Sequence, residues 1–212
     1  MYVMSVNVAR VREINFQGES HKTGIFKEPV AGLVAVSTLG LQGDRQCDLL
    51  NHGGEHKAVY GFALEHYGHW RETLANPGLE PGAFGENLTI SGLDEEALCL
   101  GDQFTIGSVQ LEVSQPRVPC FKLGIALEDE RAPALFSQYF HTGIYFRVLQ
   151  EGSLKKGNTC ERTFSHPAGL SVHSLFRAFY DRDYPDRSSL LANACKLEAL
   201  APEWQHKLRT RR

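Results

Sequence analysis

The sequence predicts a mainly β protein, a closed β-barrel-like domain with a few helices, followed by a small C-terminal unit of three helices. Three observations predict this architecture. Short apolar segments with glycine-rich turns fill the first part of the chain, and of its 20 glycines only Gly169 lies beyond residue 165. Short strands with such turns are typical of barrels and sandwiches. After residue 165, apolar residues recur at helical spacing, so we divide the chain into a barrel domain, 1–163, and a helical extension, 164–212.

Three segments support the strand prediction. Residues 3–16 are rich in Val and Ile, with partial alternation, and end before Gln17-Gly18. Residues 104–113 alternate apolar and polar side chains on both sides of Gly107-Ser108, which fits a two-residue hairpin turn with glycine first. Residues 144–150 form a further predicted strand.

Two helices are expected to interrupt these strands. Residues 63–75 place apolar side chains on one stripe and end at Asn76-Pro77-Gly78, and residues 132–140 carry Pro133 near their start. In the tail, the spacing predicts helices from about 172, from about 187 to 195 and from about 197 to 208. Three short helices have little core of their own, so we expect them to dock on the barrel or on a partner subunit, such as a second copy in a homodimer.

Composition excludes several classes of protein. Of the 212 residues, 42% are hydrophobic, which argues against a disordered chain, and the net charge of −3 argues against a generally cationic nucleic-acid binder. The basic C-terminus is expected to be a solvated end. No apolar run is long enough for a membrane helix, and no export signal is visible. The five cysteines include no CxxC pair, so neither a disulfide framework nor a cysteine-only zinc site is expected, and a reducing cytoplasm is the predicted location.

Two glycine-rich motifs are candidates for ligand binding. Gly43-Asp44 and Asn51-His52-Gly53-Gly54 could bring backbone N–H groups close to an anion, with His52 beside them, although a tight turn also explains them. Gly85-Glu86-Asn87 could present a carboxylate and an amide to a heterocycle. The alternative is that both side chains close the turn by bonding to the backbone.

The third candidate is the segment Ser114-Gln-Pro-Arg-Val-Pro-Cys-Phe-Lys-Leu123. Its two prolines stiffen the segment and preclude a helix through it. Arg117 and Lys122 would favour the thiolate of Cys120, which is the form that binds metals and acts as a nucleophile, and they could also neutralise a phosphate. The alternative is a buried structural cysteine. We favour the functional interpretation because charge partners and loop rigidity coincide.

Other polar residues give weaker signals. His66 and His69 could ligate a metal, but a solvated helix face is the expected outcome, and Glu55, His56 and Lys57 are expected to be surface charges. Cys120 and His52 could form a nucleophile pair in a cofactor-free thiol enzyme, although nothing in their spacing specifies it. The sequence carries no GxSxG, P-loop or Rossmann motif.

Taken together and in order, these motifs resemble MOSC-domain proteins of the YiiM type. The matching segments are Gly40-Leu-Gln-Gly-Asp44, His52-Gly-Gly54, Phe84-Gly-Glu-Asn-Leu88, Gly101-Asp102 and Ser114-Gln-Pro-Arg-Val-Pro-Cys-Phe-Lys122. The helical tail resembles the three-helix extension of that type. The resemblance implies a barrel-like domain that holds a molybdenum cofactor, with Cys120 as the molybdenum ligand. A thiolate is the soft ligand that a sulfur-rich metal centre prefers.

The remaining roles are inferred from chemistry and position. Arg117, Lys122 and the Gly53-Gly54 backbone are expected to contact the phosphate and ring of the pterin, while His52 and Asn87 could hydrogen-bond cofactor or substrate. His52 or Lys122 is the expected proton donor.

The resemblance also implies reduction of N-hydroxylated compounds, including hydroxylamino-purines, to the parent amine. Because the sequence has no iron–sulfur or Rossmann motif, we expect the electrons to come from a separate reductase. The alternative function is a non-catalytic carrier of the cofactor or of sulfur that uses the same pocket.

Overall fold

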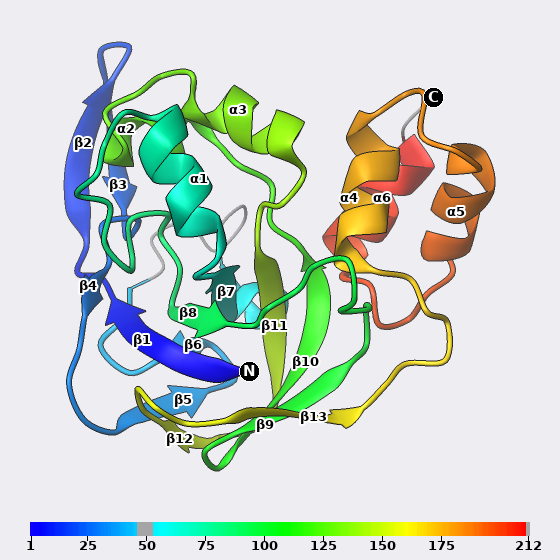
Figure 1. The fold of residues 1–212 in the computed structure, drawn as a ribbon, viewed down its shortest axis with the longest axis horizontal. Helices are drawn as coiled ribbons and strands as arrows, with labels where there is room; N and C mark the ends of the chain where they lie inside the picture. The colour runs from blue at the N-terminus through cyan, green and yellow to red at the C-terminus, as the bar shows by residue number, and fades with distance from the viewer. Residues whose placement is uncertain (46–52, 211–212) are drawn as a thin grey trace.

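The computed structural model describes residues 1–45 and 53–210, which form one eight-stranded mixed sheet, two smaller sheets and six α-helices (Figure 1). The strands are β1 (Tyr2–Val8), β2 (Arg12–Phe16), β3 (Glu19–Thr23), β4 (Glu28–Pro29), β5 (Val34–Ser37), β6 (Gly40–Leu41), β7 (Val59–Ala63), β8 (Leu88–Ser91), β9 (Gln103–Ile106), β10 (Val109–Pro116), β11 (Ile144–Gln150), β12 (Gly152–Leu154) and β13 (Cys160–Phe164). The helices are α1 (His66–Thr73), α2 (Phe121–Ala126), α3 (Ala132–Tyr139), α4 (Val172–Tyr180), α5 (Arg187–Ala194), α6 (Pro202–Thr210) and the short 3-10 helix η1 (Glu55–Lys57).

The large sheet has the strand order β13-β9-β10-β11-β7-β8-β1-β4. Its pairs are antiparallel except for β7 and β8, which run parallel. The predicted hairpin is confirmed: Val109 pairs with Ile106 across Gly107, whose φ of +61° suits a residue without a side chain. The predicted strand over 144–150 is β11. Residues 3–16 form two strands, β1 and β2, and β2 pairs with β3 in a separate hairpin.

The mainly β class is confirmed, whereas the closed barrel is not established. Among the described residues, the strand order of the large sheet ends at β13 on one side and at β4 on the other. Backbone hydrogen bonds nevertheless join the start of β1 to the segment that enters β13, from Val3 N–H to Asn158 O and from Cys160 N–H to Met1 O, both at 2.9 Å. These bonds curve the sheet back toward its own edge without forming a continuous ladder of paired strands.

Helices α1 and α3 pack together through aromatic side chains near the large sheet (Figure 1). Trp70 of α1 stacks on Phe136 of α3 with ring centroids 3.9 Å apart, and both side chains are fully buried. The prediction for α1 was too long at its start. Ala63 belongs to β7 and pairs with Ile90 of β8, because the apolar run before the helix is a buried strand.

Helix α2 was not predicted. The segment between Pro116 and Cys120 is irregular as expected, but a helix begins at Phe121, immediately after it. A proline just before a helix costs no hydrogen bond, because the first N–H groups of a helix have no partner within it. The proline pair therefore determined where the helix starts and did not exclude it.

The three predicted tail helices are confirmed as α4, α5 and α6, the last beginning at Pro202 rather than near residue 197. They gather beside β10 and β11 in Figure 1. Buried Phe176 and Trp204 belong to the same hydrophobic cluster as the sheet residues Leu111 and Phe146. The three helices therefore dock on the β domain, which is one of the two arrangements expected from the sequence.

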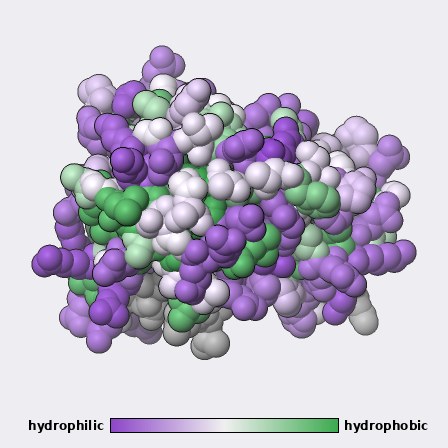
Figure 2. Space-filling view, turned by 90° about the horizontal axis from the view of Figure 1, so that it is seen from below, coloured by the Kyte–Doolittle hydropathy of each residue, from purple (hydrophilic) through white to green (hydrophobic). Residues whose placement is uncertain are grey.

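Figure 2 shows the face below the view of Figure 1, where apolar side chains form separate groups among hydrophilic ones. Scattered apolar residues of this kind are normal on the surface of a globular protein. Within the described part of the chain, none of the helices is both long enough and apolar enough to span a bilayer.

Candidate functional site

The segment from Ser114 to Lys122 turns from the end of β10 into α2 and carries the predicted cysteine. The N–H of Arg117 donates to Gly143 O at 3.1 Å, which fixes the backbone where β10 ends. Cys120 is the N-cap residue of α2, with extended φ and ψ of −133° and 173°, and its side chain is half-buried. The positive end of a helix favours a thiolate at this position. The sulfur is therefore partly accessible and lies at the start of α2.

Arg117 is buried beside this sulfur, with 5% of its surface exposed. Its guanidinium lies over the rings of Tyr60 and Phe136, at 5.3 and 5.8 Å from their centroids. Burial opposes the charge, but Tyr60, Tyr145 and the Cys120 sulfur together hold the pKa of Arg117 above its usual value. Within the described chain, its Nη1 atom has no hydrogen-bond partner. A buried N–H without an acceptor is costly, so this arginine is poised to donate to a ligand.

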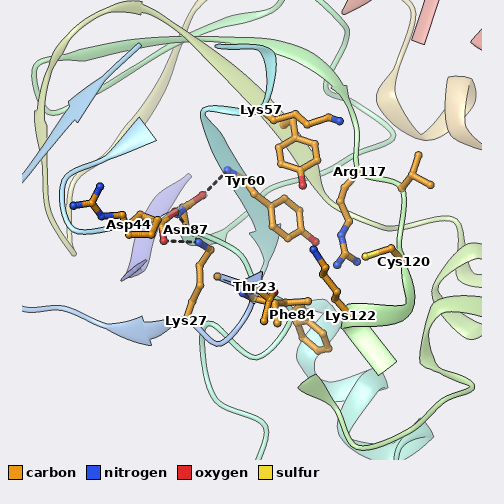
Figure 3. A pocket seen from close by; sticks show the side chains of 16 residues that line it. Thr23, Lys27, Asp44, Lys57, Tyr60, Phe84, Asn87, Arg117, Cys120 and Lys122 are labelled. Atoms are coloured by element: carbon orange, nitrogen blue, oxygen red, sulfur yellow. Dashed lines mark hydrogen bonds and ion pairs between the residues drawn. The ribbon is translucent and has the colours of Figure 1, made fainter. Parts of the chain in front are cut away.

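One pocket brings Arg117, Cys120 and Lys122 together, and Figure 3 shows their side chains converging from three sides. The described residues that line it include five Lys or Arg side chains and one carboxylate: Lys27, Arg45, Lys57, Arg117, Lys122 and Asp44. This imbalance creates a positive potential in a shielded space. The pocket therefore suits an anionic ligand, such as a phosphate-bearing molecule.

Asp44, Lys27 and Asn87 form a buried network on the side of the pocket away from Cys120 (Figure 3). Lys27 Nζ donates to both carboxylate oxygens of Asp44 at 2.6 and 2.7 Å, and Asn87 Nδ2 donates to Asp44 Oδ2 at 2.9 Å. The Asn87 Oδ1 atom accepts from the N–H of Tyr60 at 3.0 Å. The amide of Asn87 thus holds Asp44 and β7 in place, while Asp44 neutralises Lys27.

The neighbouring turn at Gly85-Glu86 is held by the buried carboxylate of Glu86. It accepts from the N–H of Gly82 at 2.8 Å and from that of Phe84 at 3.2 Å, and also from the Tyr67 hydroxyl. The alternative in which Glu86 closes the turn is therefore correct, and its side chain is absent from the pocket lining.

A second depression meets the first at Cys120. The first cavity measures about 90 Å³ and the second about 250 Å³, and they share Lys57, Val118, Cys120 and Tyr145 as lining residues. The second is bounded by Glu203 and Trp204 of α6. The sulfur therefore lies between a narrow cationic pocket and a wider depression formed partly by the C-terminal helices.

The structure brings together four of the predicted site residues: Asn87, Arg117, Cys120 and Lys122. Gly53 and Gly54 are not among the lining residues, and Gly54, with φ of +87°, is the N-cap of η1. His52 lies outside the described residues.

Sequence reasoning missed several cations of the pocket, and its expectation for Lys57 was wrong. Lys57 is 7% exposed, lines both cavities and forms an ion pair with Glu203 of α6. The sequence did carry a signal that Lys57 is buried, because this residue comes directly before the apolar residues of a buried strand. Lys27 and Arg45 gave no comparable signal. His66 is not on a solvated face either: only 15% of its side chain is exposed, whereas His69 is exposed as expected.

Comparisons with known proteins identify the family of this chain. The family model described as "MOSC domain" matches residues 48–161. The uncharacterized protein YflK of Bacillus subtilis (strain 168) is 38% identical over 205 residues, covering 96% of this chain and 90% of that protein. A protein named "Reductase" from Gibberella moniliformis is 35% identical over 182 residues, which cover 83% of this chain but only 32% of that protein. The crystal structure of YiiM from Geobacillus stearothermophilus superimposes with a TM-score of 0.82 and 31% identity, over 98% of this chain and 97% of that one. Because both the family model and full-length relatives match, this chain belongs to the MOSC domain family and is of the YiiM type.

Proposed function

We propose that this protein binds a molybdenum cofactor around Cys120 and reduces N-hydroxylated compounds, such as hydroxylamino-purines, to the parent amines. Membership of the MOSC family supports the cofactor, and the relative named "Reductase" supports the reaction class. The overall reaction takes two electrons and two protons, breaks the N–O bond and releases water. The four cysteines that the structure describes form no disulfide with one another, and we propose a reducing cytoplasm as the location of the protein.

One observation carries the proposal: an accessible thiol lies in a cationic pocket beside a buried guanidinium nitrogen that has no partner. The cofactor combines a metal that prefers sulfur ligands with an anionic phosphate. The thiol of Cys120 fits the metal, and the unpartnered Nη1 of Arg117 fits an anion. The residues present therefore match the donor and acceptor requirements of the group.

We assign the binding roles on this basis. Cys120 would ligate molybdenum, while Arg117 and Lys122 would contact the pterin and its phosphate; Gly53 and Gly54, which do not line the pocket, receive no role. When bound, the cofactor supplies the two-electron chemistry that cleaves the N–O bond. Asn87 acts through Asp44, keeping the charge on Lys27 neutralised inside the pocket.

The protein must also deliver a proton to the departing oxygen. We propose Lys122 or His52 for this step. Lys122 lines the pocket and is 8% exposed, with its amine held by a long hydrogen bond, 3.4 Å, to Lys22 O. A weakly held amine next to the reacting centre can reorient toward the substrate.

Electrons are expected from a separate reductase. In the fungal relative named "Reductase", the region similar to this chain makes up about a third of the protein. We propose that the rest of that relative contributes what a partner protein contributes here. The small-molecule substrate and this electron donor are the two partners that the proposal requires.

The first test is the metal and pterin content of protein made in a host that synthesises the cofactor. Wild-type protein is expected to carry close to one molybdenum per chain, and Cys120→Ser to lose most of it. Cys99→Ser is the matched control, because Cys99 is a half-buried thiol outside the pocket. Wild-type protein without molybdenum, or Cys120→Ser with full occupancy, would refute the ligand assignment.

The second test is turnover of a hydroxylamino-purine with a low-potential electron donor. Loaded wild-type protein is expected to form the parent amine, and Arg117→Lys to retain less cofactor, because lysine lacks the planar fork that places two N–H groups on one anion. If protein loaded with cofactor shows no turnover, the non-catalytic carrier becomes the better explanation of its function. If turnover depends on the thiol but needs no metal, the cofactor-free thiol enzyme becomes the better explanation.

A further inference from the structure

Three segments far apart in the sequence bring His66, Glu95 and His141 together, away from the pocket. His66 is the first residue of α1, Glu95 lies between β8 and β9, and His141 lies between α3 and β11. One potential ligand atom from each lies within 4.8 Å of the other two. His66 Nε2 is 3.8 Å from Glu95 Oε1, and the two imidazole rings are 4.8 Å apart. The arrangement offers two ring nitrogens and one carboxylate to a common point.

The surroundings orient these donor atoms. His66 Nδ1 is bonded to the hydroxyl of Tyr139 at 3.1 Å, which leaves Nε2 facing Glu95. Both carboxylate oxygens of Glu95 accept backbone N–H groups, from Thr142 and Gly143, each at 3.1 Å. Such outer contacts fix the direction in which metal ligands point and are a regular feature of metal sites.

Within the described part of the chain, no Lys or Arg side chain forms an ion pair with Glu95. Its carboxyl group is 1% exposed and faces the imidazole of His66. In addition, His141 Nδ1 is buried with no hydrogen-bond partner within the described chain. A buried carboxylate that no cationic side chain compensates is stabilised by a bound cation.

We propose that His66, Glu95 and His141 bind one divalent transition-metal ion, with Zn²⁺ the best match to two imidazoles and a carboxylate. Ligands about 2.1 Å from a tetrahedral zinc lie about 3.4 Å apart. The observed 3.8 Å between His66 Nε2 and Glu95 Oε1 therefore requires a shift of only a few tenths of an ångström. Solvent would complete the coordination.

The ion would brace the loop that supports the pocket. Thr142, next to His141, accepts from the Tyr60 hydroxyl and donates through its own hydroxyl to Arg117 O, both at 2.7 Å. The N–H of Arg117 also donates to Gly143 O at 3.1 Å. Fixing His141 and Glu95 would thus restrain the segment against which Arg117 is placed, which gives the ion a structural role.

A neighbouring group competes for the same histidine. Glu96, His141 and His173 also lie within ligand distance of one another, and the His173 ring stacks on that of His141 at 4.6 Å. We assign the ion to the first group because Glu95 is buried and oriented by two N–H groups, whereas Glu96 is exposed to solvent. The two placements predict different effects of mutation.

The test is a titration of chelator-treated, full-length protein with Co²⁺, followed by displacement with Zn²⁺. It is run in a Cys120→Ser background, so that the pocket thiol contributes no binding and the result is independent of the proposed function. We expect one Co²⁺ per chain, with visible absorption bands typical of a low-coordinate site. His66→Ala and His141→Ala should weaken binding at least tenfold. His69→Ala is the matched control, because its ring lies on the same helix and stacks on Tyr139 but belongs to neither group.

Tyr139→Phe keeps every ligand atom and removes only the outer contact to His66, so it remains informative if an alanine variant fails to fold. Loss of an outer contact typically weakens metal binding about 10- to 100-fold. Absence of stoichiometric binding to the starting protein would overturn the proposal. So would binding that survives His66→Ala and Tyr139→Phe unchanged but is lost in His173→Ala, because the ion would then occupy the neighbouring group.

Discussion

Trp204 of α6 links the C-terminal helices to the strand that leads to Cys120, and its replacement should be severely destabilising. The side chain is 1% exposed and packs against Phe179, with ring centroids 5.1 Å apart. Its indole N–H donates to Pro116 O at 3.2 Å, directly before Arg117. We therefore expect Trp204→Ala to weaken both the docking of the helices and the support of the pocket loop.

The expected magnitude follows from burial and from this hydrogen bond. Replacing a buried Phe or Trp by Ala costs about 3–5 kcal/mol, and an orphaned buried acceptor adds about 1–3 kcal/mol when water cannot reach it. We expect a loss of about 4 kcal/mol, since solvent can reach Pro116 O once the indole is gone. With a urea dependence of about 2 kcal/mol per molar, the midpoint should fall by roughly 2 M. Trp204→Phe keeps most of the packing and should lose only about 1–2 kcal/mol.

The assay is urea unfolding followed by tryptophan fluorescence and far-UV circular dichroism. The chain has two tryptophans, Trp70 and Trp204, so single Trp→Phe variants report separately on the helix α1 region and on the C-terminal helices. Because Trp204 shares a hydrophobic cluster with the large sheet, we expect both reporters to change in one transition. His206→Ala, an exposed change on the same helix, is the control and should alter stability by less than about 0.5 kcal/mol.

A loss below about 1 kcal/mol in Trp204→Ala would refute this reasoning. So would unfolding of the C-terminal helices at a clearly lower urea concentration than the rest of the chain, because it would mean that the shared cluster does not couple them.

Three further predictions concern buried charges and thiols. Asp44→Asn leaves Lys27 buried without its ion-pair partner and should lower the free energy of unfolding in urea by about 3–5 kcal/mol. The control is Glu28→Gln, at an exposed ion pair, which should change that free energy by less than about 0.5 kcal/mol. Equal effects of the two changes would contradict the role of burial. Burial raises the pKa of the Cys160 thiol to about 12, whereas its pKa in the unfolded chain is near 8.5. The thiol therefore contributes fully to the free energy of unfolding below pH 8.5, and this contribution is lost as pH rises toward 12. Between pH 9 and 10.5, wild-type protein should therefore lose up to about 1.4 kcal/mol per pH unit more than Cys160→Ala, and parallel stability curves would disprove this. In native protein at pH 8, iodoacetamide should modify Cys120 much faster than Cys160, as measured by peptide mass spectrometry, and comparable rates would show that the pocket sulfur is not accessible.

Elements defined by neighbouring residues were predictable. The β9–β10 hairpin follows from alternation around Gly107, and α4 follows from the spacing of Val172, Leu175 and Phe176, since both patterns repeat within a few residues. The start of α1 was misplaced because a short apolar run suits a buried strand and a helix equally well. Only its pairing with β8 settles which one forms.

The same distinction applies to the site. The stiff segment carrying Arg117, Cys120 and Lys122 could be identified from its residues alone, because charge, thiol and proline stand next to one another in the chain. The distribution of the remaining charges could not be identified in this way. Lys27 enters the pocket from the segment before β4. Lys57 is buried and forms an ion pair with Glu203, which lies 146 residues further along the chain.

The sequence by itself therefore determined the β-rich class, the helical tail and the reactive segment, because each depends on the chemistry and spacing of adjacent residues. Only the tertiary structure decided that the tail forms one wall beside the cysteine and that five Lys or Arg side chains line the pocket. It also decided that two histidines and a glutamate meet at one point. These features depend on long-range packing, in which the free energy of burying a charge or a ring is set by residues that the local sequence does not specify.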